Sequence, residues 1–162
     1  SKTKKLQTKQ HLEAAMEIER KFLVKQIPDD LSQYHCRQIE QAYLNTEPVV
    51  RIRQDNDAYY LTYKSKGFLV REEYNLPLDK ESYLHLRQKS DGIIITKKRY
   101  EIPYLEQYTI ELDIFEGHHA GLVLAEVEFT GTDEAGQFPV PDWFSTDVTC
   151  VREYSNSHLS MC

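Results

Sequence analysis

Acidic and basic side chains alternate with apolar ones along several short segments of this 162-residue sequence. In the segment that begins at Glu17, two carboxylates and one ammonium group follow one another at every second position, through Glu19 to Lys21. Mg²⁺ and Mn²⁺ prefer oxygen ligands such as carboxylates. Guanidinium and ammonium groups bind phosphate oxygens through charge-assisted hydrogen bonds. Both kinds of group together predict a site for a metal-bound polyphosphate.

The same pattern recurs further along the chain, mostly as like-sign pairs at positions i and i+2. The acidic positions are Glu17, Glu19, Glu111, Asp113, Glu126 and Glu128. The basic positions are Lys21, Arg51, Arg53, Lys64, Arg71, Lys97 and Arg99. In a β-strand these side chains share one face and stand about 7 Å apart, since each residue rises about 3.3 Å. Like charges so close repel one another, so the segregated pairs favour a ligand that needs both signs.

A simpler explanation exists for any single strand, because a half-buried sheet puts charges on its wet face and apolar groups on its dry face. A structural β-barrel whose paired charges face bulk water is therefore one alternative. An ordinary surface would mix the two signs, which makes the segregated pairs less typical of it.

The period of two predicts the elements that must position these residues. Eight strands are expected, at 16–24, 38–45, 49–55, 58–65, 69–77, 93–102, 107–115 and 122–130. Short helical pieces are expected at 28–33, 79–89, 132–137, 141–144 and 156–161. Eight short strands with only a few short helical pieces between them indicate an antiparallel barrel or sandwich. With the charged faces inward, the barrel has a polar lumen, and the few helices cover its apolar outer faces.

Composition restricts the function classes. Twenty basic against 26 acidic residues give a net charge of −6, which argues against a nucleic-acid or anionic-membrane binder. The three cysteines form no close pair, which indicates a reducing compartment and no zinc site. No apolar run reaches the roughly 18 residues of a membrane span, and no signal peptide precedes the first strand, so we expect a cytoplasmic protein. Residues 1–15, polar and basic, are interpreted as an N-terminal extension or a remnant of cloning, and 16–162 as one domain.

The ordered set of motifs resembles the CYTH domain family, the triphosphate tunnel metalloenzymes. The matching segments are EIERKFLV (17–24), QAYL (41–44), RIR (51–53), YLTYKSKG (60–67), LVREEY (69–74), KKRY (97–100), IELDIF (110–115), LAEVEF (124–129) and PDWF with DVT (141–149). The resemblance extends from residue 16 to about residue 160 and implies an eight-stranded antiparallel barrel that holds a triphosphate in its tunnel.

The resemblance also implies an activity. Short single-domain members resemble inorganic triphosphatases, which cleave tripolyphosphate to pyrophosphate and phosphate with Mg²⁺ or Mn²⁺, and nucleoside triphosphates are further substrates to consider. A class IV-like adenylate cyclase and a thiamine triphosphatase are alternatives within the family. A non-catalytic module that binds polyphosphate or nucleotides is an alternative of another class. A homodimer is compatible with the family.

Roles follow from the resemblance, position by position. Glu17, Glu19 and Glu128 are expected to be direct metal ligands, and the other acidic positions further carboxylates of the metal site. All seven basic positions are expected to bind phosphate. The residues expected to be catalytic are Glu19, Lys21, Arg53 and Glu111. Tyr43 is expected at the tunnel mouth or in the core.

One segment departs from the family. Relatives often carry basic residues around the C-terminal tyrosine, where this chain has Glu153, Tyr154 and Ser155. The family implies that this segment closes one end of the tunnel, so the change affects which substrate fits. Arg152 is a candidate to compensate.

Overall fold

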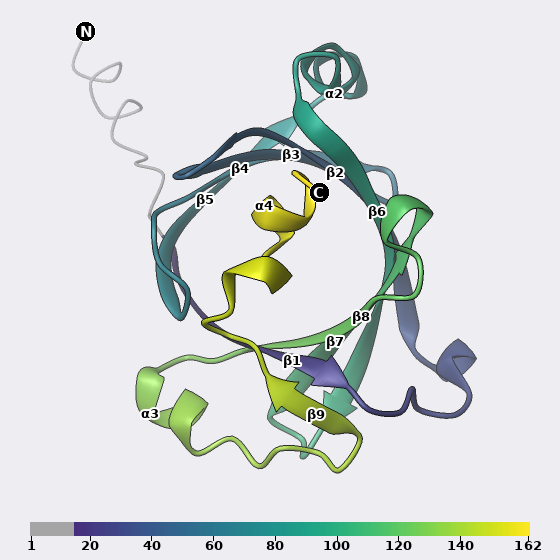
Figure 1. The fold of residues 1–162 in the computed structure, drawn as a ribbon, viewed down its shortest axis with the longest axis vertical. Helices are drawn as coiled ribbons and strands as arrows, with labels where there is room; N and C mark the ends of the chain where they lie inside the picture. Colours follow the sequence, from purple (N-terminus) through teal and green to yellow (C-terminus); the bar gives the residue numbers. More distant parts are fainter. Residues whose placement is uncertain (1–14) are drawn as a thin grey trace, which may run out of the picture.

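The computed structural model describes residues 15–162, which form nine strands and a few short helices (Figure 1). The predicted N-terminal extension, except for Ala15, lies outside the described residues. The strands are β1 (Ala15–Val24), β2 (His35–Thr46), β3 (Val49–Asp55), β4 (Ala58–Lys64), β5 (Val70–Leu78), β6 (Asp91–Tyr104), β7 (Tyr108–Glu116), β8 (Val123–Glu128) and β9 (Phe144–Asp147). The α-helices are α2 (Lys80–Arg87), α3 (Thr132–Gly136) and α4 (Asn156–Leu159), and 3-10 turns occupy Leu31–Gln33, Gly117–His119 and Arg152–Tyr154.

Eight strands close into an antiparallel barrel, which confirms the predicted fold. The order around the ring is β5-β4-β3-β2-β6-β7-β8-β1, and β1 also pairs with β5. β1 divides its pairing along its length: residues 15–18 face β5 and residues 19–23 face β8. The strand that begins the chain therefore joins the two edges of the sheet, so the barrel has no open seam there.

The ninth strand was not predicted. Helical structure was expected at 141–144, but the chain makes a turn there and enters β9, which lies beside β1. Phe144 stacks against Phe22 with ring centroids 4.8 Å apart, and Arg20 forms an ion pair with Asp147 at 2.8 Å. These contacts with β1, distant in sequence, favour a short strand over the helix that the local residues predict.

Helix α2 covers the outer face of the barrel at β2, β3 and β4 (Figure 1). Asp79 caps it by accepting a hydrogen bond from the Ser82 backbone N–H at 2.6 Å. Tyr83 is fully buried against Ala42 and Ile52. The outward apolar faces are thus covered by a helix at this place, as predicted.

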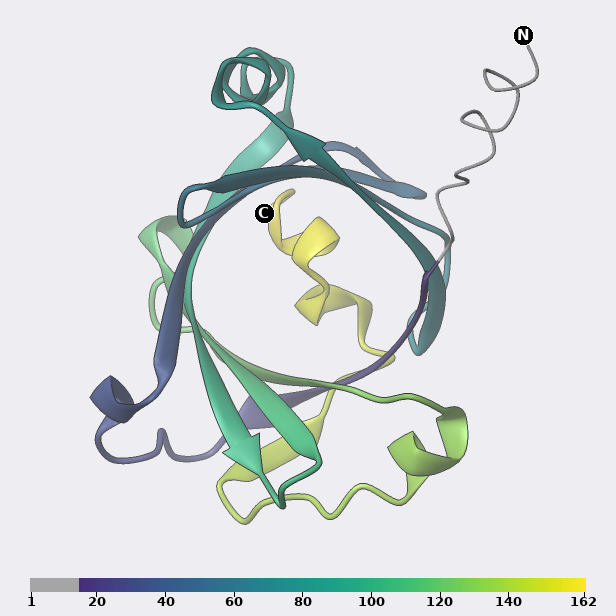
Figure 2. The same ribbon diagram turned by 180° about the vertical axis from the view of Figure 1, so that it is seen from behind.

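Helix α4 lies inside the ring of strands instead of on its outer face (Figure 2). Its Leu159 is buried in an apolar cluster with residues of the inner barrel wall. We call this cluster the apolar plug: Tyr43, Val49, Ile95, Phe115, Leu124, Val148 and Leu159. The Ile93 N–H donates to the Ser160 carbonyl at 2.5 Å, and the His119 ring lies 2.7 Å from the Leu159 carbonyl. The C-terminal segment is therefore anchored within the barrel.

None of the helices within residues 15–162 is long and apolar enough to cross a membrane.

Candidate active site

The barrel encloses a polar cavity of about 410 Å³. Most of the predicted site residues line it: Glu17, Glu19, Lys21, Arg51, Arg53, Lys64, Arg71, Arg99, Glu111, Glu126 and Glu128. Lys97 and Asp113 do not line the cavity; both side chains are 0% exposed inside the barrel, where Lys97 contacts Asn156 of helix α4 at 3.3 Å. The prediction that the paired charges face one lumen is confirmed, so the alternative of a barrel with these charges in bulk water is wrong.

A second cavity of about 250 Å³ adjoins the first and shares Glu19, Lys21 and Arg71 with it. It lies between the β4–β5 loop, which contributes Lys66 and Phe68, and the C-terminal segment. One carboxylate and two cations thus belong to both cavities, and the other predicted site residues of the larger cavity line that cavity alone.

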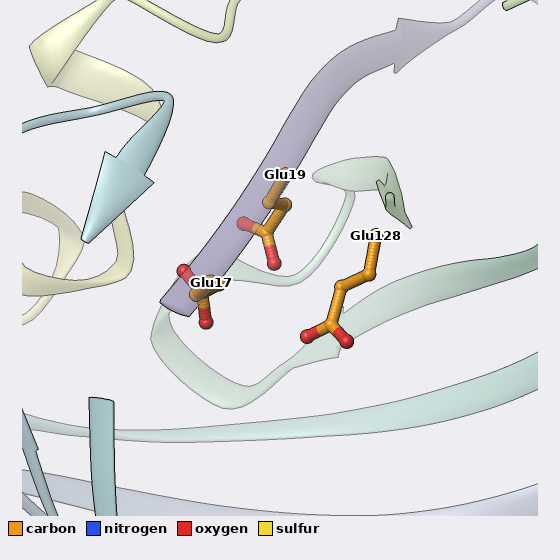
Figure 3. A group of neighbouring side chains, drawn as sticks. All are labelled: Glu17, Glu19 and Glu128. Atoms are coloured by element: carbon orange, nitrogen blue, oxygen red, sulfur yellow. The ribbon is translucent and has the colours of Figure 1, made fainter. Parts of the chain in front are cut away.

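Strand register brings three carboxylates together (Figure 3). Glu19 in β1 pairs directly with Glu128 in β8, and Glu17 stands two residues before Glu19 on the same face. One oxygen from each of the three carboxylates lies within 4.8 Å of the others. We call Glu17, Glu19 and Glu128 the acidic cluster. These are the residues that the sequence analysis named as direct metal ligands.

Within the acidic cluster, the three carboxylates differ in their counter-charges. Glu17 forms ion pairs with Lys64 at 2.6 Å and with Arg71 at 3.0 Å. Burial acts to raise the pKa of Glu17, but Lys64, a hydrogen bond with Glu73 and the charge of Arg71 together outweigh it and hold that pKa below its usual range.

Glu19 and Glu128 form no ion pair with any cation in the described part of the chain. Burial, with the charges of Glu126 and Glu17, raises the pKa of Glu19 to about 8. Burial and neighbouring carboxylates, Glu111 first among them, raise the pKa of Glu128 to about 7. Protons or an external cation must therefore offset the charge of these two residues.

In a second group of charged residues, every carboxylate has a cation partner within the protein. Asp113 lies 2.7 Å from both Lys97 and Arg99, and Arg99 also contacts Glu126 at 3.1 Å and Glu111 at 2.8 Å. We call these five residues the ion-pair cluster. Burial alone would raise the pKa of Asp113, but Arg99 and Lys97 lower it below its usual value. Burial lowers the pKa of Lys97 to about 7, against the opposing effect of Asp113.

Two arginines of β3 face the same cavity without a carboxylate partner among the described residues. Burial, with the charges of Arg51 and Arg99, lowers the pKa of Arg53 to about 9. The Arg51 Nε atom is buried and has no hydrogen-bond partner in the described part of the protein. Unpaired, buried guanidinium groups are suited to bind an anion.

The C-terminal segment contacts the lumen through neutral oxygens. The Lys21 ammonium donates to the Tyr154 carbonyl at 3.1 Å, and the Lys97 ammonium donates to Asn156 Oδ1 at 3.3 Å. Ser155 lines both cavities, whereas Arg152 has a side chain that is 71% exposed. Arg152 nevertheless lines the smaller cavity, so its role in replacing the basic residues that relatives carry around the C-terminal tyrosine stays a prediction.

Sequence reasoning missed the neutral polar residues of the lumen. Gln41 accepts two hydrogen bonds from Arg53, and Asn75 connects Thr62 to Glu73. Gln41 lies two residues before the cavity-lining Tyr43, and Asn75 lies two residues after the cavity-lining Glu73. Residues two apart on a strand share a face, so the alternation of the sequence could have identified both. Tyr43 fits both expectations, since it lines the cavity and is part of the apolar plug.

The donor set of the acidic cluster fits a divalent metal ion. Its three carboxylates supply oxygen ligands, and two of them lack a counter-charge in the described chain. Mg²⁺ and Mn²⁺ are both typical of such oxygen sites. With the unpaired arginines nearby in the same cavity, the site can bind a cation and a polyanion together.

Comparisons with known proteins agree with this geometry. The model of the CYTH domain family matches residues 15–139. A protein of Nitrosomonas europaea named inorganic triphosphatase is 38% identical over 148 residues, which are 90% of this chain and 97% of that protein. An inorganic triphosphatase of Acetivibrio thermocellus is 35% identical over 88% of this chain and 92% of its own length. A crystal structure of an inorganic triphosphatase superposes with a TM-score of 0.68 at 36% identity, covering 90% of this chain and 95% of the other.

Proposed function

The chain belongs to the CYTH domain family, and from this premise we propose that it hydrolyses inorganic tripolyphosphate to pyrophosphate and phosphate with a divalent metal ion. The relatives named inorganic triphosphatase match nearly the whole chain, which confirms the prediction of a triphosphatase. The observation that carries the proposal within the molecule is the acidic cluster in one closed lumen with the unpaired arginines.

Glu17, Glu19 and Glu128 would hold the metal ion. A metal ion in such a site neutralises phosphate charge and lowers the pKa of bound water. We choose these three because one oxygen from each lies within 4.8 Å of the others, and two of them, Glu19 and Glu128, form no ion pair among the described residues. The three carboxylates of the ion-pair cluster would instead hold the cations around the substrate in position. Mg²⁺ and Mn²⁺ are the metal ions that we propose.

Arg51 and Arg53 would receive the phosphate groups first, since no carboxylate has to be displaced from them. Their planar guanidinium groups bind phosphate oxygens at two points. Lys21, Lys64, Arg71 and Arg99 line the same cavity and would contact further oxygens, each from an existing ion pair. Lys97 does not line the cavity and would act through its contact with Asp113.

Catalysis in this lumen would depend on positioning and electrostatics. No histidine or cysteine is among the described residues that line the larger cavity, so a covalent enzyme intermediate at either residue type is not part of the proposal. The barrel wall holds the phosphate ligands on neighbouring strands, whose register fixes their relative positions. Groups fixed in this way stabilise developing charge without reorganising at the moment of reaction.

The test is phosphate release from tripolyphosphate, ATP and thiamine triphosphate, each assayed with Mg²⁺, with Mn²⁺ and with EDTA. We expect fast, metal-dependent release from tripolyphosphate and slow release from ATP. Formation of cyclic AMP and pyrophosphate from ATP, without phosphate release from tripolyphosphate, would contradict the proposal in favour of a cyclase. Binding of tripolyphosphate without any release would contradict it in favour of a binding module. A cytoplasmic location and a homodimer stay predictions.

A further inference from the structure

Gln41 lies on the lumen side of β2 but does not line the cavity. Its side chain is fully buried, and its position in the register is directly opposite Arg53 in β3. Gln41 Oε1 accepts hydrogen bonds from Arg53 Nε at 3.0 Å and from Arg53 Nη2 at 2.6 Å. Because two donors of a rigid guanidinium plane meet one acceptor, the contact fixes the orientation of Arg53.

The environment of Arg53 contrasts with that of Arg99. Arg99 is oriented by three carboxylates, Glu111, Asp113 and Glu126, which offset its charge. Arg53 is oriented by a neutral amide, and its guanidinium has no carboxylate partner among the described residues. Arg99 is thus held by groups that neutralise its charge, whereas Arg53 is held by a group that leaves its charge in place.

An amide at position 41 leaves a buried N–H group without a hydrogen-bond partner among the described residues, which a carboxylate there would not do. Gln41 Nε2 is buried and has no hydrogen-bond partner in the described part of the protein. A glutamate has nearly the same shape, would offer the same acceptor to Arg53 and would leave no N–H unsatisfied. It would also neutralise Arg53. The amide therefore orients the guanidinium and leaves its positive charge uncompensated.

We propose that Gln41 is a positioning residue for substrate binding, which holds Arg53 toward the lumen while keeping its charge available to a phosphate group. This inference depends on the proposed triphosphatase function. It assigns to Gln41 a role in affinity, since the charge of Arg53 attracts the bound triphosphate and the transition state alike. Loss of such uniform binding raises KM and leaves kcat largely unchanged.

The test uses Gln41→Glu, Gln41→Met and the control Gln26→Glu. Gln26 comes two residues after β1, its side chain is exposed, and that side chain forms no hydrogen bond within the described part of the protein, so it controls for the added charge. Steady-state hydrolysis of tripolyphosphate and the melting temperature are measured for each variant. For Gln41→Glu we expect KM to rise about tenfold or more, with kcat within about twofold and an unchanged or higher melting temperature. Gln41→Met should raise KM less, and Gln26→Glu should behave like the unmodified chain.

The outcomes separate this inference from the function on which it depends. An unmodified chain without activity on tripolyphosphate would contradict the proposed function, and this inference with it. An active unmodified chain with the same KM in Gln41→Glu would overturn this inference alone. If Gln41→Glu does not fold, Gln41→Met decides, and an unchanged kcat/KM in that variant would overturn it.

Discussion

The acidic cluster and the ion-pair cluster lie in the same barrel and both consist of buried charges, yet they are balanced differently. In the ion-pair cluster, Lys97 and Arg99 offset Asp113 and Glu126 at distances of 2.7 to 3.1 Å. In the acidic cluster, Glu19 and Glu128 have no cation of the described chain beside them, and the pKa of each is raised. The first arrangement is complete in the protein alone, whereas the second is suited to receive a cation from outside.

This difference assigns separate duties to residues that look alike in sequence. Glu126 and Glu128 stand two positions apart on one strand, yet Glu126 contacts Arg99 and Glu128 forms no ion pair among the described residues. Strand register in the folded barrel, and not the local sequence, determines which carboxylate contacts an arginine. Changes in the ion-pair cluster should therefore reduce stability, and changes in the acidic cluster should reduce metal binding and turnover.

The largest effect is expected for Asp113→Asn. This change leaves Lys97 and Arg99 close together without their shared carboxylate. Removing one partner of a buried ion pair typically costs about 3–5 kcal/mol. The free energy of unfolding, measured with urea, should fall by about that amount. A variant as stable as the unmodified chain would contradict the role that we assign to this cluster.

Glu19→Gln should act on the reaction. The loss of one carboxylate from the acidic cluster should lower kcat by about 100-fold or more, the typical cost of removing one group that stabilises the transition state. Its stability without metal should not decrease, since a buried carboxylate without a counter-cation is replaced by an amide of the same shape. Glu72→Gln is the control, because Glu72 is exposed on the neighbouring β5. If the two variants had equal kcat at saturating Mg²⁺, Glu19 would have no role in the reaction, which would contradict its assignment to the active site.

The pH dependence of stability should also distinguish the clusters. The folded, metal-free chain keeps protons on Glu19 up to a pKa of about 8, and the ordinary value is 4.5. Between these values the folded state binds more protons than the unfolded state, so this residue makes stability fall as pH rises from 5 to 8. Lys97 acts in the opposite direction above its pKa of about 7, because the unfolded chain keeps that proton longer.

The measurement is therefore a difference between two chains. The free energy of unfolding is determined in EDTA from pH 5 to pH 8 for the unmodified chain and for Glu19→Gln, which retains Lys97. The unmodified chain should lose more stability over this range than the variant. Saturating Mg²⁺ at pH 8 should reduce the loss in the unmodified chain only. If the free energies of unfolding of the two chains in EDTA changed in parallel with pH, Glu19 would not hold a proton in the folded state over this pH range.

The smallest effect is expected for Glu73→Gln. Glu73 lies 3.4 Å from Lys64, which is already held by Glu17 at 2.6 Å. Because Lys64 keeps Glu17 as a partner when Glu73 is changed, we expect kcat/KM to change by about threefold or less. Ion pairs that are not fully buried contribute little free energy. A loss as large as that of Glu19→Gln would place Glu73 within the acidic cluster.

Strand parity made most of the fold predictable from the sequence. The alternation around Glu17, Arg51 and Glu126 placed charged residues on one face of each strand, and the structure confirms that this face is the lumen. The exceptions depended on distant contacts. β9 has only four residues and forms against β1, which the local pattern does not reveal. The helix α4 was predicted at 156–161, but the local pattern does not show that it packs inside the barrel.

The site was less predictable, because partners across the barrel depend on register and not on residue type. Nothing in the spacing of Asp113 says that it is fully buried beside Lys97 inside the barrel while Glu128 lines the cavity. Gln41 was missed because the search followed charge, and its importance appears only when Arg53 is seen opposite it. The family resemblance supplied the roles that geometry could then refine.

The most direct test of the account is to locate the metal. A crystal grown with Mn²⁺ and examined by anomalous scattering shows which carboxylates bind the ion. We predict a manganese peak bonded to oxygens of Glu17, Glu19 and Glu128, with Asp113 still paired to Lys97 and Arg99. A peak at Asp113 and Glu126, with the acidic cluster empty, would contradict it.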